Sequence, residues 1–122
     1  MVSPTVLVVD DHAMFRTTAR ALLEADGYEV VGEAPTASAG VEAVRELHPD
    51  VVLIDVCLPD GDGFEIAAIL ASGFRESAVI VTSSSDDPLY HGRAAGCGAR
   101  GFLAKHDVSG AALDRLLGGG SS

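Results

Sequence analysis

The sequence VLVVDD, residues Val6–Asp11, joins an apolar run directly to two aspartates. An uninterrupted aliphatic run is typical of a strand that is buried on both faces of a parallel sheet. The pattern recurs in VVLID, where Asp55 follows Val51–Ile54, and two further runs end on Ser83 and Lys105. Because the carboxyl ends of parallel strands lie at one edge of a sheet, these polar residues are predicted to meet in one site.

Amphipathic segments separate the apolar runs. After the first run, Phe15, Ala19 and Leu23 recur at helical spacing, and Asp26-Gly27 ends that helix. Later helices are expected to begin after the capping residues Thr36, Asp87 and Ser109, with Pro88 in the first turn of the helix that follows Asp87. The expected strands are Val6–Val9, Tyr28–Ala34, Val51–Ile54, Ala78–Thr82 and Gly101–Ala104.

This alternation predicts an α/β fold with a doubly wound sheet of five parallel strands. Helices would cover both faces, with right-handed crossovers. A flavodoxin-like (βα)5 order of strands, 2-1-3-4-5, would place the first and third strands side by side and the less apolar second strand at an edge. A loop rich in Pro and Gly is expected after Asp55, followed by a helix over Phe64–Ala71 that Gly73 ends.

Composition and charge limit the class of protein. A chain of 122 residues with 48% apolar residues and no Trp suits one domain with an aliphatic core. No apolar run approaches the roughly 20 residues of a membrane-spanning helix, and the N-terminus does not resemble a signal peptide, so we expect a cytoplasmic protein. The net charge of −10 argues against direct contact with nucleic acid or an anionic membrane.

Two cysteines do not make a disulfide framework, so Cys57 and Cys97 are expected to be reduced. The last residues, Gly118–Ser122, read as a flexible linker by composition. They could be a natural end or the point where a longer protein continues.

The aspartates point to a bound cation. An Asp pair after a strand is by itself common at turns and helix caps. The third carboxylate, Asp55, changes this balance, because three converging carboxylates repel one another unless a cation compensates. Mg²⁺ suits a site of carboxylates, waters and a phosphate. Lys105 could then neutralise phosphoryl oxygens and Ser83 could donate a hydrogen bond to one, so the site reads as a phosphoryl acceptor.

These residues resemble the receiver (CheY-like) domain of two-component response regulators, in particular the type attached to LuxR-like DNA-binding domains. The matching strings are VLVVDDHAMFR, DVVLIDVCLPDGDGFE, AVIVTSSSDD and GARGFLAK. Their order and spacing are specific to this family. The resemblance covers residues 5–117, so one receiver domain is expected over residues 1–117, with a tail at residues 118–122.

The resemblance implies a role for each matching residue. Asp55 would be the phosphorylated aspartate, and Lys105 the invariant lysine. Asp11 would contact Mg²⁺ directly, Asp10 would act through water, and the backbone carbonyl of Cys57 would be a further metal ligand.

The switch residues are less fully determined by the motif. The family's switch hydroxyl has two candidates, Thr82 and Ser83, and the interval to the lysine favours Ser83. The aromatic switch position falls on Phe102, which has no hydroxyl. His106 follows the lysine where most receivers have proline, a feature of the LuxR-attached type.

Two other reactive side chains near the site, His12 and Cys57, are not predicted to take part in its chemistry. His12 adjoins the acidic pair, but the four histidines lack metal-binding spacing, so His12 is expected to be a solvated surface residue. The Cys57 thiol is expected to be structural.

The resulting hypothesis is a switch that accepts a phosphoryl group on Asp55 from a sensor histidine kinase and passes the signal to an unknown output domain or protein. It would be a monomer or a phosphorylation-dependent dimer and not an enzyme, beyond self-phosphorylation from donors and slow autodephosphorylation. One alternative is a Mg²⁺-dependent phosphohydrolase with an aspartyl-phosphate intermediate, although Cys57 stands where such enzymes place a general acid. The other is a receiver-like interaction module that signals without phosphorylation.

Overall fold

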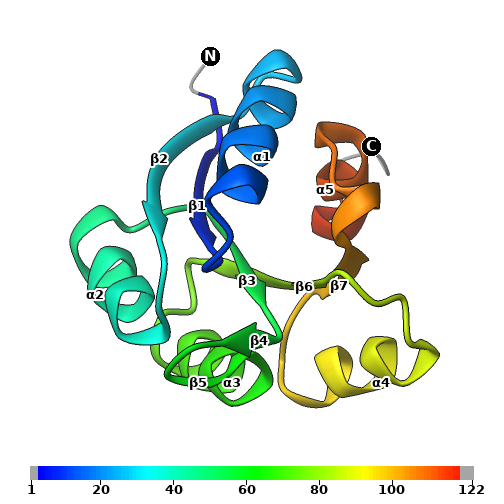
Figure 1. Ribbon diagram of the computed structural model, residues 1–122. Coiled ribbons are helices and arrows are strands. Elements are labelled where there is room, and N and C mark those ends of the chain that lie inside the picture. The colour runs from blue at the N-terminus through cyan, green and yellow to red at the C-terminus, as the bar shows by residue number, and fades with distance from the viewer. Residues whose placement is uncertain (1–2, 119–122) are drawn as a thin grey trace.

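The computed structural model describes residues 3–118 and contains a five-stranded parallel sheet in the order β2-β1-β3-β6-β7 (Figure 1). This is the order predicted from the sequence, because β6 and β7 are the fourth and fifth expected strands, and β2 lies at an edge. The strands are β1 (Thr5–Val9), β2 (Glu29–Ala34), β3 (Val51–Asp55), β6 (Ala78–Ser83) and β7 (Gly101–Ala104).

The helices begin close to the predicted caps. Thr36 Oγ1 accepts a hydrogen bond from Ala39 N at 3.1 Å, and Asp87 and Ser109 cap their helices in the same way. Capping side chains satisfy amide groups that have no partner in the first turn. The helices are α1 (Ala13–Ala25), α2 (Ala37–Leu47), α3 (Gly63–Gly73), α4 (Pro88–Gly96) and α5 (Gly110–Leu117), with a 3-10 turn η1 (Lys105–Asp107) after β7.

The segment after Asp55 differs from the expected loop. It contains a short antiparallel hairpin, β4 (Cys57–Leu58) paired with β5 (Gly61–Asp62). Two-residue strands have no hydrophobic periodicity, so only their pairing in the folded chain reveals them. The hairpin leads directly into α3, where Asp62 caps the first turn by accepting a hydrogen bond from Phe64 N at 2.8 Å.

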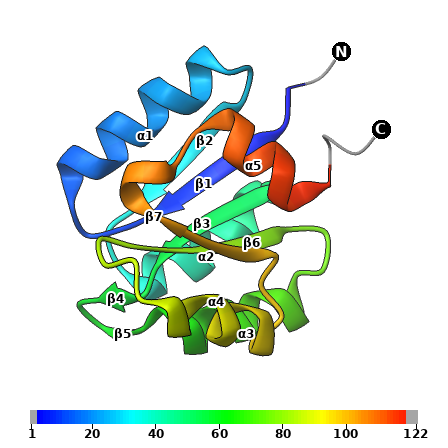
Figure 2. The same cartoon turned by 90° about the vertical axis from the view of Figure 1, so that its right-hand side faces the viewer.

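Two hydrophobic cores lie on the two faces of the sheet, with α1 and α5 on one side and α2, α3 and α4 on the other (Figure 2). Successive side chains of a strand point to opposite faces. Leu7 and Val9 of β1 therefore enter the core with α2, α3 and α4, whereas Val6 and Val8 enter the core with α1 and α5. This double burial explains why the central strands are continuously apolar.

The chain ends and the surface show further properties. Gly118, predicted as the start of the tail, is the left-handed C-cap of α5, and residues 119–122 of that tail lie outside the described residues.

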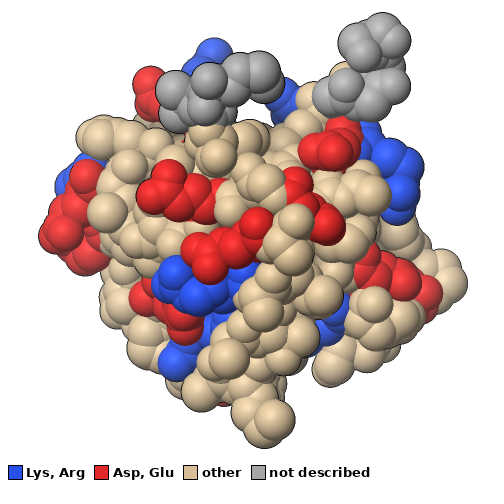
Figure 3. Space-filling view, turned by 90° about the horizontal axis from the view of Figure 1, so that it is seen from above, with Lys and Arg blue, Asp and Glu red and all other residues tan. Residues whose placement is uncertain are grey.

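Acidic side chains are spread over the face seen from above and lie beside the basic ones (Figure 3). Cys57 and Cys97 are both free thiols, as predicted. Within residues 3–118, none of the helices has the length and apolar character needed to cross a membrane.

Candidate functional site

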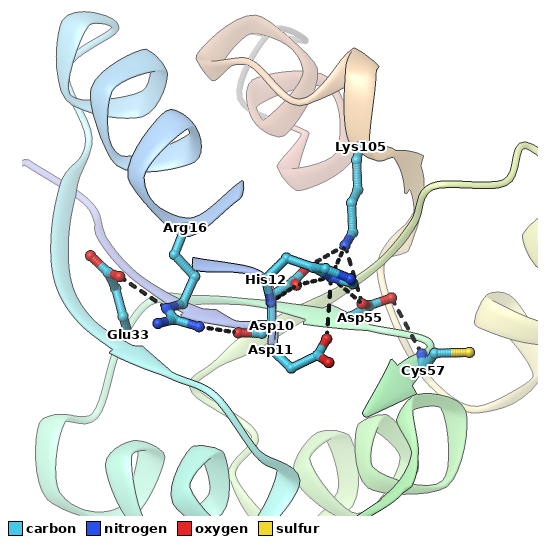
Figure 4. Close-up of polar contacts among 8 residues, drawn as sticks. All are labelled: Asp10, Asp11, His12, Arg16, Glu33, Asp55, Cys57 and Lys105. Carbon is cyan, nitrogen blue, oxygen red and sulfur yellow. Dashed lines mark hydrogen bonds and ion pairs between the residues drawn. The ribbon is translucent and has the colours of Figure 1, made fainter. Parts of the chain in front are cut away.

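The carboxyl ends of β1, β3 and β7 bring four charged residues together (Figure 4). Asp10 and Asp11 directly follow β1, Asp55 is the last residue of β3, and Lys105 directly follows β7. The register of β1 and β3 pairs Val9 with Ile54, so the aspartates after each strand are neighbours. The residues predicted from strand ends are thus assembled at one edge of the sheet.

Lys105 joins the two buried carboxylates. Its Nζ lies 2.7 Å from Asp10 Oδ2 and 3.2 Å from Asp55 Oδ2. The residues Asp10 and Asp55 are 0% and 3% exposed, so water screens these ion pairs weakly. One ammonium between two carboxylates leaves the group with net negative charge, which a second cation would neutralise.

Backbone amides hold the carboxylates in place. His12 N donates to Asp10 Oδ1 at 2.8 Å, and Cys57 N donates to Asp55 Oδ1 at 3.3 Å. Gly63 N donates to Val56 O at 2.8 Å, which ties the start of α3 to the end of β3. The acidic groups are therefore oriented by their own chain neighbours before any ligand arrives.

Two residues that the sequence did not point to support the end of β1. The guanidinium of Arg16 donates from Nη1 to Asp10 O at 2.7 Å and from Nε to Glu33 Oε1 at 3.1 Å (Figure 4). Glu33 also accepts from Arg20 Nε at 2.9 Å. Although burial raises the pKa of the Glu33 carboxyl, its bonds to the two arginines outweigh this and lower the pKa. Arg16 thus connects α1 and β2 to the site.

The surroundings shift the pKa of both members of the buried ion pair, Asp55 and Lys105. Burial raises the pKa of Asp55, and the charge of Asp10 raises it further, against the opposing effects of Cys57 N and Lys105. Burial lowers the pKa of Lys105, but its interactions with Asp10 and Asp55 outweigh that effect and raise it overall. A carboxylate with a raised pKa is a better nucleophile, and a neighbouring ammonium with a raised pKa keeps its positive charge. This combination is suited to attack on an anionic phosphoryl group.

Replacement of Asp55 by Asn is expected to raise the free energy of unfolding at neutral pH. Because the folded-state pKa of Asp55 is raised, its ionisation costs stability; this cost is absent below the unfolded pKa of about 4 and grows as pH rises through the folded value. Urea unfolding at several pH values should show the gain of Asp55→Asn shrinking towards acid pH. The exposed Asp107→Asn is the control, and a less stable Asp55→Asn at neutral pH would contradict the expectation.

The model of one protein family, the response regulator receiver domain, matches residues 6–115. The chain belongs to this family. The family to which the sequence motifs pointed is thereby confirmed, and the strands that end in Asp10, Asp11, Asp55 and Lys105 are those of a receiver domain of two-component systems.

Relatives and solved structures agree with this assignment. The chain is 36% identical over 102 residues to the virulence-factor transcription regulator BvgA of Bordetella pertussis, covering 84% of this chain and 49% of that protein. It is 39% identical over 101 residues to the transcriptional regulatory protein NarL of Mycobacterium tuberculosis, covering 82% and 47%. The receiver domain has a TM-score of 0.85 with the solved receiver domain of that NarL, at 33% identity, covering 97% and 99% of the two chains.

A second solved structure is similar, a LuxR-family two-component response regulator from Aurantimonas sp. SI85-9A1, with a TM-score of 0.84, 26% identity and coverage of 96% and 87%. The receiver domain spans about half the length of BvgA and NarL.

The two candidate switch hydroxyls of the receiver domain have different surroundings. Ser83 is buried, and its Oγ accepts a hydrogen bond from Ser85 N at 3.0 Å. Thr82 is the register partner of Asp55, and its buried Oγ1 has no hydrogen-bond partner within residues 3–118. Thr82 therefore lies beside the end of β3, and Ser83, the next residue of β6, is paired with Ala104 of β7.

Phe102, the predicted aromatic switch residue, is buried in β7 and packs on α4. Its ring centroid lies 5.4 Å from that of Tyr90 and 5.0 Å from that of His91. Tyr90 in turn contacts Phe64 of α3, with ring centroids 5.5 Å apart. This aromatic row joins β7, α4 and α3. A movement of Phe102 would therefore change its contacts with α4.

His12 is a site residue that the sequence reasoning set aside. Its side chain is exposed, as expected, but the Nδ1 atom lies 3.0 Å from Asp10 Oδ1 and 3.2 Å from Asp11 Oδ1 (Figure 4). Asp10, Asp11, His12 and Asp55 each offer one potential ligand atom, and these atoms lie within 4.8 Å of one another. The available signal in the sequence was the position of His12 next to the acidic pair. In the structure His12 is also the N-cap residue of helix α1.

Proposed function

We propose that this receiver domain accepts a phosphoryl group on Asp55 from a phosphohistidine of a sensor histidine kinase and acts as a phosphorylation-dependent switch. The observation that carries the proposal is the buried ion pair of Asp55 with Lys105 beside Asp10 and Asp11. The pair supplies a nucleophile with a raised pKa and a cation for the incoming oxygens.

The acidic residues fit a divalent cation. Asp10 Oδ2 is buried and accepts no well-oriented hydrogen bond within residues 3–118, although the Lys105 ammonium lies 2.7 Å away. In our proposal Asp11, Asp55 and the Cys57 carbonyl hold Mg²⁺ directly, and Asp10 holds it through water. When bound, Mg²⁺ would withdraw charge from the phosphoryl oxygens.

The transfer itself exchanges one bond for another. A carboxylate oxygen of Asp55 attacks phosphorus, the N–P bond of the donor phosphohistidine breaks, and the donor imidazole leaves with the electron pair and takes up a proton. Lys105 contributes by neutralising charge on the phosphoryl oxygens. The product is an acyl phosphate on Asp55.

The proposed switch links this new charge to α4. Ser83 turns towards the phosphoryl group and donates a hydrogen bond, and Phe102 shifts with the end of β7. Because Phe102 packs on Tyr90, the population of α4 positions changes with it.

Ser83→Ala is expected to accept the phosphoryl group at a similar level but to lose at least half of the phosphorylation-dependent amide shifts in α4 and β7. NMR spectra before and after treatment with donor measure this, with Thr82→Ala as the matched control that retains the shifts. The reverse result would assign the switch hydroxyl to Thr82.

The partners follow from the family and from charge. We propose a sensor histidine kinase as phosphoryl donor and a DNA-binding output domain as recipient of the signal, since the relatives BvgA and NarL are described as transcription regulators. The net charge of −10 disfavours direct contact between this chain and DNA, so we assign DNA binding to the output domain. The receiver acts as a monomer or as a dimer that forms on phosphorylation.

The test is to incubate the protein with Mg²⁺ and a small acyl phosphate and to follow its intact mass. We expect the mass of one added phosphoryl group, absent from Asp55→Asn. Catalytic consumption of donor without an adduct would indicate the hydrolase instead. With no adduct and no consumption at any donor concentration, the phosphorylation-independent module would replace the proposal.

A further inference from the structure

The surroundings of His12 Nδ1 contain an electrostatic mismatch. This atom lies 3.0 Å and 3.2 Å from carboxylate oxygens of Asp10 and Asp11, and 3.2 Å from Lys105 Nζ. A ring nitrogen that carries a proton can donate it to one of the carboxylates, but it then has no lone pair to accept from the Lys105 ammonium, which lies 3.2 Å away. Without the proton it accepts from Lys105 but faces carboxylate lone pairs. No form of the ring satisfies all of these contacts.

The separations around His12 Nδ1 match those among ligands of one cation. At metal–ligand distances near 2.1 Å, adjacent octahedral ligands lie about 3.0 Å apart and opposite ligands about 4.2 Å apart. For the two carboxylates that hold the cation directly in the proposed site, Nδ1 lies 3.2 Å from Asp11 Oδ1, close to the adjacent-ligand distance, and 4.0 Å from Asp55 Oδ2, close to the opposite-ligand distance. A cation between these electron-rich atoms would attract each of them and so offset their mutual repulsion.

We propose that His12 Nδ1 is a metal ligand, so that this receiver prefers imidazole-binding first-row cations such as Co²⁺ over Mg²⁺ more strongly than an all-oxygen site would. Imidazole nitrogen favours such cations, whereas carboxylate, carbonyl and water favour Mg²⁺. The inference rests on the proposed metal site at Asp11 and Asp55, and it adds a residue that sets which cation the site selects.

The first measurement is the affinity for Co²⁺ and for Mg²⁺ by isothermal titration calorimetry. In His12→Ala we expect the ratio of the Co²⁺ to the Mg²⁺ association constant to fall on the order of tenfold, because the nitrogen ligand is lost. His106→Ala removes another exposed imidazole, which lies 3.6 Å from Asp107 Oδ1 and outside the cluster, and should leave the ratio unchanged. Circular dichroism without metal checks that each variant is folded.

The second measurement identifies the ligand directly. Pulsed electron paramagnetic resonance of bound Mn²⁺ should show ¹⁴N modulation from a coordinated imidazole in the unaltered protein and in His106→Ala, and none in His12→Ala. An unchanged affinity ratio in His12→Ala, or no ¹⁴N modulation in the unaltered protein, overturns the assignment of His12. Failure of every variant to bind any divalent cation would instead overturn the proposed metal site itself.

Discussion

Gly63→Ala is expected to lower the free energy of unfolding by about 3 kcal/mol and to disturb the position of Asp55. A Cβ at residue 63 would lie 2.0 Å from Asp55 O and 2.6 Å from Val56 Cα. Both are backbone atoms, so no side chain can rotate to make room. The first turn of α3 would have to move away from β3, which breaks the 2.8 Å hydrogen bond from Gly63 N to Val56 O.

Gly73→Ala is the matched control, because Gly73 ends the same helix and a Cβ there would have no neighbour within 4 Å. We expect the control to be unchanged or slightly stabilised. Urea unfolding measures both variants, and donor-dependent mass analysis follows the site. Equal stability of Gly63→Ala and the unaltered protein would show that α3 can move without cost, against the tight contact described.

Lys105→Met is expected to lower the free energy of unfolding at neutral pH by about 3–5 kcal/mol, the scale for removing one partner of a buried ion pair. The variant leaves the Asp10 and Asp55 carboxylates buried without their ammonium, which lies 2.7 Å and 3.2 Å from them. While the two carboxylates are ionised, the stabilisation by Lys105 is fully present below the unfolded lysine pKa of about 10.4 and is lost as pH rises through its raised folded value.

Chemical unfolding from acid to neutral pH tests this expectation. The deficit of Lys105→Met should shrink at acid pH, where protonated carboxyls no longer need a cation. In the Asp55→Asn background the same substitution should cost less, because one of the two carboxylates has been neutralised. An equal cost in both backgrounds would mean that Lys105 stabilises the fold through its packing instead of its charge.

The sequence was most informative where one local rule decides the outcome. The central strands were recognisable because they are buried on both faces, and Thr36, Asp87 and Ser109 were recognised as caps because capping depends on the next few residues. The hairpin of β4 and β5 was missed because its strands are two residues long. The support of the site by Arg16 and Glu33 was missed because it joins α1 to β2.

The sequence by itself determined the fold family and the set of charged strand ends, Asp10, Asp11, Asp55 and Lys105, because burial of strands and motif spacing are written along the chain. Only the tertiary structure placed the His12 ring nitrogen among the carboxylates and the start of α3 against the Asp55 carbonyl. Such contacts depend on side-chain direction and on close approach between separate elements. These are properties of the packed chain and not of residue spacing.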